Sequence, residues 1–135
     1  MNQIPPENSI SYEYRLTVKG SDLDALNHVN NVVYLQWVND ISERHWSLLA
    51  DESLRKKYFW VVLRHEIDYL NQAFSGDEIR IVTWVGESQG VRSVRHVQMF
   101  SGEKVLIRAS STWCLIDAST LRPTRIKEDI LRILT

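Results

Sequence analysis

The pattern of apolar and polar positions predicts one strand, a long helix and then further strands. Residues 10–19 alternate in polarity, which is typical of a half-buried strand. From Asn31 to about Leu49, apolar residues recur every three or four positions, as in a helix that buries one face. At about 1.5 Å per residue such a helix is roughly 28 Å long and can cross a small sheet.

The rest of the chain has the pattern of strands separated by turns. Four segments are apolar or alternating, namely 58–70, 78–85, 91–100 and 105–116, and turn residues stand at 75–77, 87–90 and 101–104. Short turns join antiparallel neighbours, so we expect an α+β fold with the helix on one face of the sheet. Residues 125–134 are expected to close the chain as a short helix or turn. A sheet with open edges also favours pairing with a second copy, hence a homodimer.

Composition limits the classes of protein that remain. At 135 residues, without repeats or linkers, residues 1–135 are expected to form a single domain. Sixteen basic and seventeen acidic residues give no charge signature for nucleic acid or for an anionic membrane. No apolar run approaches the roughly 20 residues that span a bilayer, and residues 1–8 lack the features of a signal peptide. The single Cys114 fits a reducing compartment, so we predict a cytoplasmic protein.

Polar residues concentrate just before the predicted helix. Residues 21–31 contain two aspartates, one histidine and three asparagines. Asp22 and Asp24 can cap turns, and Asn30 or Asn31 can cap the helix. The same groups can also perform chemistry, because free N–H groups in the first turn of a helix stabilise negative charge. The residues alone leave both interpretations open, and His28 can equally orient a carboxylate or bond to a loop carbonyl.

This stretch resembles the signature of a known enzyme family. The run Asp22-Leu-Asp-Ala-Leu-Asn-His-Val-Asn-Asn31, followed by Tyr34, is similar to that of hotdog-fold thioesterases of the 4-hydroxybenzoyl-CoA thioesterase-like family. Residues 65–70 with Gly76-Asp77, and residues 109–117 with Arg122-Pro123, resemble later blocks of the same family. The resemblance implies a hotdog fold, in which a five-stranded antiparallel sheet wraps around one long central helix. It also implies a homodimer or homotetramer.

The resemblance further implies an acyl-CoA thioester hydrolase whose catalytic residue is Asp24. The carboxylate would act as general base on water or as nucleophile on the thioester carbonyl. Amides of the first helical turn would polarise that carbonyl. The expected substrate-binding residues are His28, Asn30, Asn31, Val32 and Tyr34. Asp22 is expected to be structural.

One position departs from the family pattern. Asn27 stands where the family usually has glycine, which suggests a left-handed backbone that asparagine also tolerates. Aromatic residues such as Trp37, Trp60 and Tyr69 either line an acyl pocket or belong to the core.

Other chemistries have weaker support. The four histidines show no metal-ligand spacing, no Gly-x-Ser-x-Gly elbow occurs, and Cys114 reads as a buried structural thiol. We therefore expect neither a metal nor a bound cofactor. The alternatives are an acyl-carrier-protein thioesterase of the same fold and a non-catalytic acyl-thioester-binding or dimeric interaction module. Surface cations are needed for the phosphates of coenzyme A, and the candidates are Arg92, Arg95, Arg108, Arg122 and Arg125.

Overall fold

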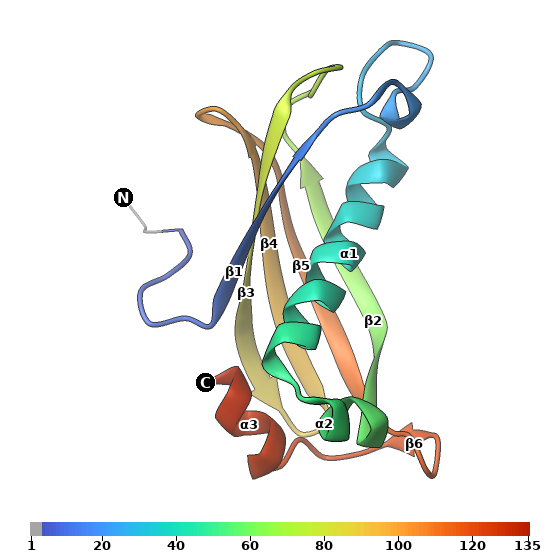
Figure 1. Ribbon diagram of the computed structural model, residues 1–135, viewed down its shortest axis with the longest axis vertical. Coiled ribbons are helices and arrows are strands. Elements are labelled where there is room, and N and C mark those ends of the chain that lie inside the picture. The colour runs from blue at the N-terminus through green and yellow to red at the C-terminus, as the bar shows by residue number, and fades with distance from the viewer. Residues whose placement is uncertain (1–3) are drawn as a thin grey trace.

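A long helix lies across the concave face of a curled antiparallel sheet (Figure 1). The computed structural model describes residues 4–135, so Met1–Gln3, part of the segment considered for a signal peptide, lie outside the described residues. Helix α1 spans Asn31–Leu49, the range that its apolar spacing predicts. The buried face of α1 carries Tyr34, Trp37, Val38, Ile41, Ser42 and His45.

The sheet contains five long strands in the order β1-β3-β4-β5-β2. The strands are β1 (Ser11–Thr17), β2 (Tyr58–Tyr69), β3 (Glu78–Gln89), β4 (Arg92–Ser101) and β5 (Lys104–Asp117). A short strand, β6 (Arg122–Pro123), pairs with β5. All of these pairings are antiparallel. The predicted α+β architecture, with one long helix on a five-stranded antiparallel sheet, is confirmed.

Strands β2 and β3 do not pair, although the turn expected at 75–77 implied antiparallel neighbours. β2 pairs with β5, from Tyr58 opposite Asp117 to Tyr69 opposite Ile107, and β3 lies between β1 and β4. Residues 70–77 are longer than a tight hairpin loop, and they carry the chain from one edge of the sheet towards the other. Strand β1, which precedes the helix, occupies the place beside β3. The two edges of the sheet are therefore β1 and β2.

The second expected turn, at 87–90, reverses the chain only at its last residue. A register shift between Val85 and Ser88 lets β3 continue to Gln89, and the reversal occurs at Gly90, whose φ is +64°. The hairpin at 101–104 is confirmed, with Gly102 at φ +58°. Glycine fits both turns because it adopts positive φ at no steric cost.

Three short helices complete the described chain. They are a 3-10 turn, η1 (Gly20–Asp22), and the helices α2 (Glu52–Lys57) and α3 (Glu128–Leu134). The sequence pattern missed η1 and α2, because one or two turns of helix carry too few apolar positions to show a period. Asp51 caps α2 by accepting a hydrogen bond from the backbone N–H of Leu54 over 2.8 Å.

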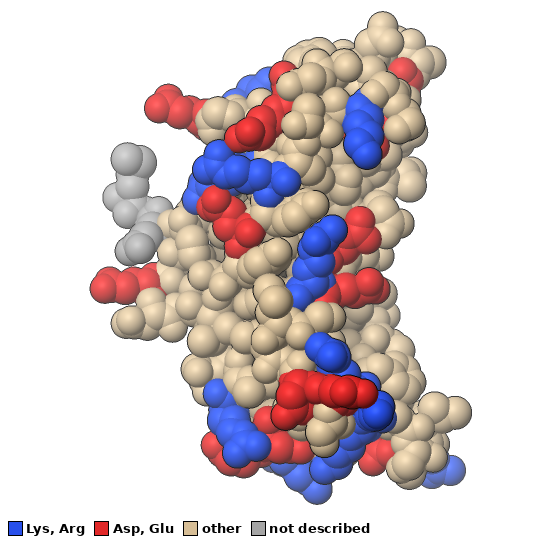
Figure 2. Space-filling model, viewed as in Figure 1, with Lys and Arg blue, Asp and Glu red and all other residues tan. Residues whose placement is uncertain are grey.

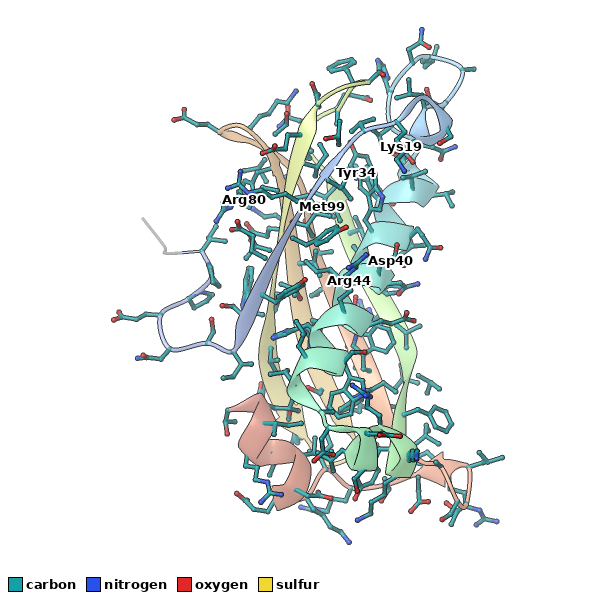
Figure 3. All side chains as sticks on the ribbon, viewed as in Figure 1. Lys19, Tyr34, Asp40, Arg44, Arg80 and Met99 are labelled. Atoms are coloured by element: carbon teal, nitrogen blue, oxygen red, sulfur yellow. The ribbon has the colours of Figure 1, made fainter. Side chains whose placement is uncertain are left out.

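The core has two parts that follow the length of α1. The larger part packs the first half of α1 against β3, β4 and β5, with Tyr34 and Met99 inside it (Figure 3). On its flank towards β1, the guanidinium carbon of Arg44 lies 4.3 Å from the centre of the Tyr14 ring. The smaller part, at the other end, joins α3 to β2 and β5 through Tyr58, Leu115 and Ile130.

The surface carries both signs of charge intermixed. Basic and acidic side chains alternate over the face seen in Figure 2, and the end where α1 begins is mostly uncharged on that face. Among residues 4–135, no helix is both long enough and apolar enough to cross a membrane.

Candidate active site at the entrance to the long helix

The carboxylate of Asp24 is held by the backbone of its own turn. Its Oδ1 accepts hydrogen bonds from the N–H groups of Leu26 and His28, at 2.9 and 3.2 Å. The backbone closes the same turn, because the N–H of Asp24 donates to the carbonyl of His28 over 2.8 Å. Within the described chain, no donor contacts Oδ2. Backbone hydrogen bonds thus fix Oδ1 of Asp24, and Oδ2 has no hydrogen-bond donor among the described residues.

The turn depends on the residue that departs from the family pattern. Asn27 has a φ of +62°, so the predicted left-handed conformation is confirmed. Its N–H donates to the carbonyl of Asp24 over 3.0 Å. An L-residue with a longer apolar side chain disfavours this conformation, whereas asparagine tolerates it.

Asp22 has a structural position, as expected. Its Oδ2 accepts a hydrogen bond from the N–H of Lys19 over 2.9 Å, and its carbonyl accepts one from the N–H of Asn30 over 2.9 Å. The first bond closes η1, and the second joins η1 to the start of α1. Asp22 therefore joins η1 to α1, whereas Asp24, two positions later, is held within its own turn.

Hydrogen bonding narrows the choice of amides at the start of α1. Asn30 is the N-cap, and its Oδ1 accepts from the N–H of Val32 over 3.0 Å. The N–H of Asn30 donates to the carbonyl of Asp22, so of the amides of Asn30, Asn31 and Val32 two have intramolecular partners. Among the described residues, the N–H of Asn31 has none. A free N–H at the positive end of a 19-residue helix favours a negatively charged oxygen.

His28 contributes its backbone to the Asp24 turn, while its ring has a different neighbour. The imidazole meets the ring of Phe74 edge-on, with centroids 5.5 Å apart. No hydrogen bond joins the imidazole to any residue in the described range, neither to Asp24 nor to a loop carbonyl. His28 is only partly buried, so its ring is partly accessible to solvent.

Tyr34 lies in the core rather than on the rim of the site. It is 3% exposed, and its hydroxyl accepts a hydrogen bond from the N–H of Ala73 over 3.2 Å. Tyr69 donates from its hydroxyl to the carbonyl of Asn31 over 3.2 Å. The two tyrosines attach the first turn of α1 to the end of β2 and to the link after it.

Exposed apolar side chains surround this helix entrance. They come from the Asp24 turn, from α1 and from the residues after β2, and they are Leu26, Val32, Tyr69, Leu70 and Phe74. Val32 is 70% exposed although it is the second residue of the helix. Sequence reasoning missed Ala73 and Phe74. They lie between the two parts of the second block of family resemblance, residues 65–70 and Gly76-Asp77, and nothing in the sequence marked them.

The aromatic residues and the arginines considered in the sequence analysis lie in different parts of the structure. Trp37 is a core residue, Trp60 lines a cavity at the far end of α1, and Tyr69 lies at the helix entrance. Arg95 is 8% exposed, so it does not belong with the surface cations considered for phosphate binding. Arg92, Arg108, Arg122 and Arg125 are exposed. Cys114 is buried, as expected of a structural thiol.

From residue 4 onward, no group of three or more His, Cys, Asp or Glu side chains is arranged to hold a metal ion. The groups at the helix entrance are the positioned carboxylate of Asp24, the free N–H of Asn31 and the partly exposed imidazole of His28.

Comparison with known proteins identifies the family of the chain. The model of the thioesterase-like superfamily matches residues 18–134. A palmitoyl-acyl carrier protein thioesterase of Arabidopsis thaliana is 31% identical over 81 residues, which is 58% of this chain and 20% of that protein. The corresponding protein of Gossypium hirsutum is 30% identical over the same shares. The chain thus spans about a fifth of the length of these plant relatives.

Solved structures share the fold along most of the chain. A predicted thioesterase from Bacillus stearothermophilus superposes with a TM-score of 0.82 at 22% identity, covering 92% of this chain and 93% of its own. A 1,4-dihydroxy-2-naphthoyl-CoA thioesterase from Synechocystis gives 0.78 at 15% identity, with 92% and 95% covered. A 12:0-ACP thioesterase from Umbellularia californica gives 0.77 at 16% identity, with 90% and 48% covered. The predicted hotdog fold is confirmed.

Proposed function

Since the chain belongs to the thioesterase-like superfamily, we propose that it hydrolyses an acyl-CoA thioester to a free carboxylic acid and CoA. The observation that carries the proposal is the Asp24 carboxylate, with Oδ1 fixed by two backbone N–H groups and Oδ2 free at the entrance to α1. We take residues 1–135 as one thioesterase domain that works without a metal or bound cofactor. On the basis of its single, buried Cys114, we place it in the cytosol.

The chemistry follows from the two groups at the helix entrance. The N–H of Asn31 stabilises the negative charge that develops on the thioester oxygen as the carbonyl carbon is attacked. In the general-base route, Oδ2 of Asp24 takes a proton from water, the hydroxide oxygen bonds to carbon, and the C–S bond breaks. The proton then passes to the leaving thiolate. In the nucleophilic route, Oδ2 itself attacks the carbonyl carbon and the C–S bond breaks, which releases the thiolate and leaves a mixed anhydride on Asp24. Water then hydrolyses this anhydride to the free acid and the Asp24 carboxylate, and the proton that water gives up passes to the thiolate.

The surrounding side chains supply the acyl site in this proposal. The backbone N–H of His28 binds the carboxylate, the His28 ring packs against Phe74, and Val32 with Phe74 offers an exposed apolar surface for the acyl group. Asn30 holds the helix entrance in shape through its cap. Tyr34 acts from behind the site, because its hydroxyl fixes the link that carries Phe74.

We propose a homodimer formed through the β2 edge, or a homotetramer made of two such dimers. The β1 edge carries ion pairs, Arg15 with Glu78 and Arg80 with Glu13, and charges on an edge strand disfavour pairing with another strand. The β2 edge instead exposes Phe59, Val61, Val62 and Leu63. Antiparallel pairing of two β2 strands about their midpoints brings the Tyr58 end of the partner's strand beside the Tyr69 end of this one. The acyl site then lies at the subunit interface.

An acyl-carrier-protein thioesterase is the second candidate, because the plant relatives carry that name. The two candidates differ in the thiol carrier and not in the chemistry at Asp24. Rates measured with one acyl group on CoA and on acyl carrier protein separate them. A kcat/KM at least tenfold higher for the CoA ester supports the first candidate, and the reverse supports the second.

The decisive test uses two neighbouring aspartates. Asp24→Asn keeps a side-chain oxygen that accepts from Leu26 and His28, and it removes only the charge. Hydrolysis of a panel of short, long and aromatic acyl-CoA esters is expected to fall by a factor of about 10² to 10⁴. Asp22→Asn likewise keeps an acceptor for Lys19, and its turnover is expected to stay within about threefold of wild type on the ground that surface polar changes are small.

Circular dichroism and size-exclusion chromatography verify that both variants fold and assemble. Unchanged turnover by Asp24→Asn removes this carboxylate from the mechanism. If the wild type hydrolyses no CoA or carrier-protein thioester, the protein is better explained as an acyl-thioester-binding or dimeric interaction module.

A further inference from the structure

A second candidate site lies on the flank of the fold where α1 leaves the edge strand β1 partly uncovered. It is a cavity of about 220 Å³ between the two elements, and we call it the α1–β1 pocket. Its floor is apolar and consists of side chains from β1, β3 and α1, namely Tyr14, Leu16, Ile81, Trp37 and Ile41. Tyr14 and Leu16 are only half-buried, whereas Ile81 on the next strand is 1% exposed. Part of the apolar surface of β1 is therefore open to a ligand.

The α1–β1 pocket is separate from the acyl site. Of the described residues, none that is assigned to the acyl site lines it. The pocket reaches the neighbouring segment η1 through Asp22, which has a structural position before α1. A ligand of this pocket is therefore a different molecule from the thioester.

Two opposite charges of α1, Asp40 and Arg44, line the pocket without pairing with each other (Figure 3). They stand four positions apart, the spacing at which side chains of a helix are neighbours and an acid and a base often pair. From residue 4 to the C-terminus, neither lies within ion-pair distance of an opposite charge. Both charges are therefore available to a ligand.

Other contacts hold these two side chains apart. The guanidinium carbon of Arg44 lies 4.3 Å from the centre of the Tyr14 ring, so this charge is turned towards β1. Oδ1 of Asp40 accepts a hydrogen bond from Nε2 of Gln36, one turn earlier in α1, over 2.9 Å. No hydrogen bond from the described chain reaches Oδ2 of Asp40. One pocket thus presents a fixed guanidinium and a carboxylate oxygen that lacks a donor.

The lining of the pocket has no net charge. Besides Asp40 and Arg44, the charged lining residues are Lys19 and Asp22, which add one charge of each sign. A simple anion at Arg44 would be repelled by Asp40, and a simple cation at Asp40 would be repelled by Arg44. A ligand with one charge of each sign satisfies both groups, and an apolar part of it covers the floor.

We propose that the α1–β1 pocket binds a small zwitterion with an apolar group, such as a free apolar α-amino acid. The planar guanidinium of Arg44 matches the two oxygens of its carboxylate. The ammonium group donates to Oδ2 of Asp40. The apolar side chain lies on the floor, against Leu16 and Trp37, where it is removed from water. Binding here is independent of thioester hydrolysis at Asp24.

The test removes one charge at a time from the ligand. Binding of L-phenylalanine, N-acetyl-L-phenylalanine and L-phenylalaninamide to the full-length protein is measured by calorimetry. N-acetylation removes the ammonium charge, and the amide removes the carboxylate. The wild type is expected to bind phenylalanine about tenfold or more tightly than either derivative, since a hydrogen bond to a charged group is worth at least about this factor.

Matched variants remove the same charges from the protein. In Arg44→Gln, the preference for phenylalanine over its amide should disappear, while the preference over the N-acetyl derivative remains. Asp40→Asn should show the opposite pattern. Glu43→Gln is the control, because Glu43 is an exposed acid of the same helix that does not line this pocket, and it should keep both preferences. Both Asp40 and Arg44 are exposed, so their substitution is expected to leave the fold intact, which circular dichroism verifies.

Nuclear magnetic resonance locates the ligand. Phenylalanine is expected to shift the backbone amide signals of Leu16, Thr17 and Ile41, which line the pocket. Equal affinity of the wild type for the three compounds, or no binding of any, overturns the proposal. So do unchanged preferences in both Arg44→Gln and Asp40→Asn, or shifts confined to residues outside the pocket. No thioester enters these measurements, so their outcome is separate from that of the Asp24 test.

Discussion

The hydroxyl of Tyr34 accepts a hydrogen bond from the backbone N–H of Ala73, 3.2 Å away and 39 positions later in the chain. Both residues are buried, with Ala73 0% exposed. This single contact attaches the first turn of α1 to the link between β2 and β3. Because Phe74 follows Ala73 and packs on His28, the contact also fixes the rim of the candidate active site.

Tyr34→Phe should therefore destabilise the protein by leaving a buried N–H without a partner. We expect the free energy of unfolding, measured by urea denaturation, to fall by about 1–3 kcal/mol. Tyr69→Phe removes a hydrogen bond to Asn31 at a half-exposed position, and its effect should stay below about 0.5 kcal/mol. Equal losses in the two variants would show that burial of the Ala73 N–H is not the cause.

The left-handed backbone at Asn27 gives a second prediction. Asn27→Ala places an unsuited residue at φ +62° and should cost about 1–2 kcal/mol of unfolding free energy. Asn27→Gly restores the residue typical of the family and should lie within about 0.5 kcal/mol of wild type, since glycine adopts this conformation freely. Thermal unfolding followed by circular dichroism measures both. If both variants lose the same stability, the side chain of Asn27 matters and its backbone conformation does not.

His45 makes stability depend on pH in a defined window. Burial and Arg95 lower its folded pKa from 6.5 to about 4, so between these values the unfolded chain binds more protons than the folded one. The free energy of unfolding should therefore fall as pH drops from about 6.5 to 4, by up to about 3 kcal/mol from this residue. Above pH 6.5 the contribution is complete and constant.

The matched variant for this prediction is His45→Gln, which keeps an acceptor for Arg95 and has no titratable ring. Urea denaturation at a series of pH values should give a shallower slope for the variant than for the wild type between pH 4 and 6.5. His65 and His96, whose pKa values burial also lowers, add dependence of the same sign to both proteins. Identical slopes in the two proteins would contradict the assigned role of His45.

Much of the fold could be predicted because the spacing of apolar residues along the chain reports helices and strands directly. The bounds of α1 follow from apolar spacing and from the cap at Asn30, and the strands follow from alternation between Gly-containing turns. The turn around Asp24 was also accessible, since the positive φ at Asn27 is a property of one residue in its local sequence. Helix α2 could not be predicted, because six residues are too few to show a helical period of apolar positions.

Strand order and the partners of polar groups needed the three-dimensional arrangement. Local sequence cannot show that β2 pairs with β5, since that choice depends on which apolar faces pack together across the whole chain. It cannot show that Arg95 lies buried against His45 either, because the two stand 50 positions apart. The sequence by itself determined the helix, the strands and a positioned aspartate at the helix entrance. Only the tertiary structure decided which oxygen and which amide stay free there, and which arginine is enclosed, because hydrogen bonding and burial depend on neighbours that are distant in the chain.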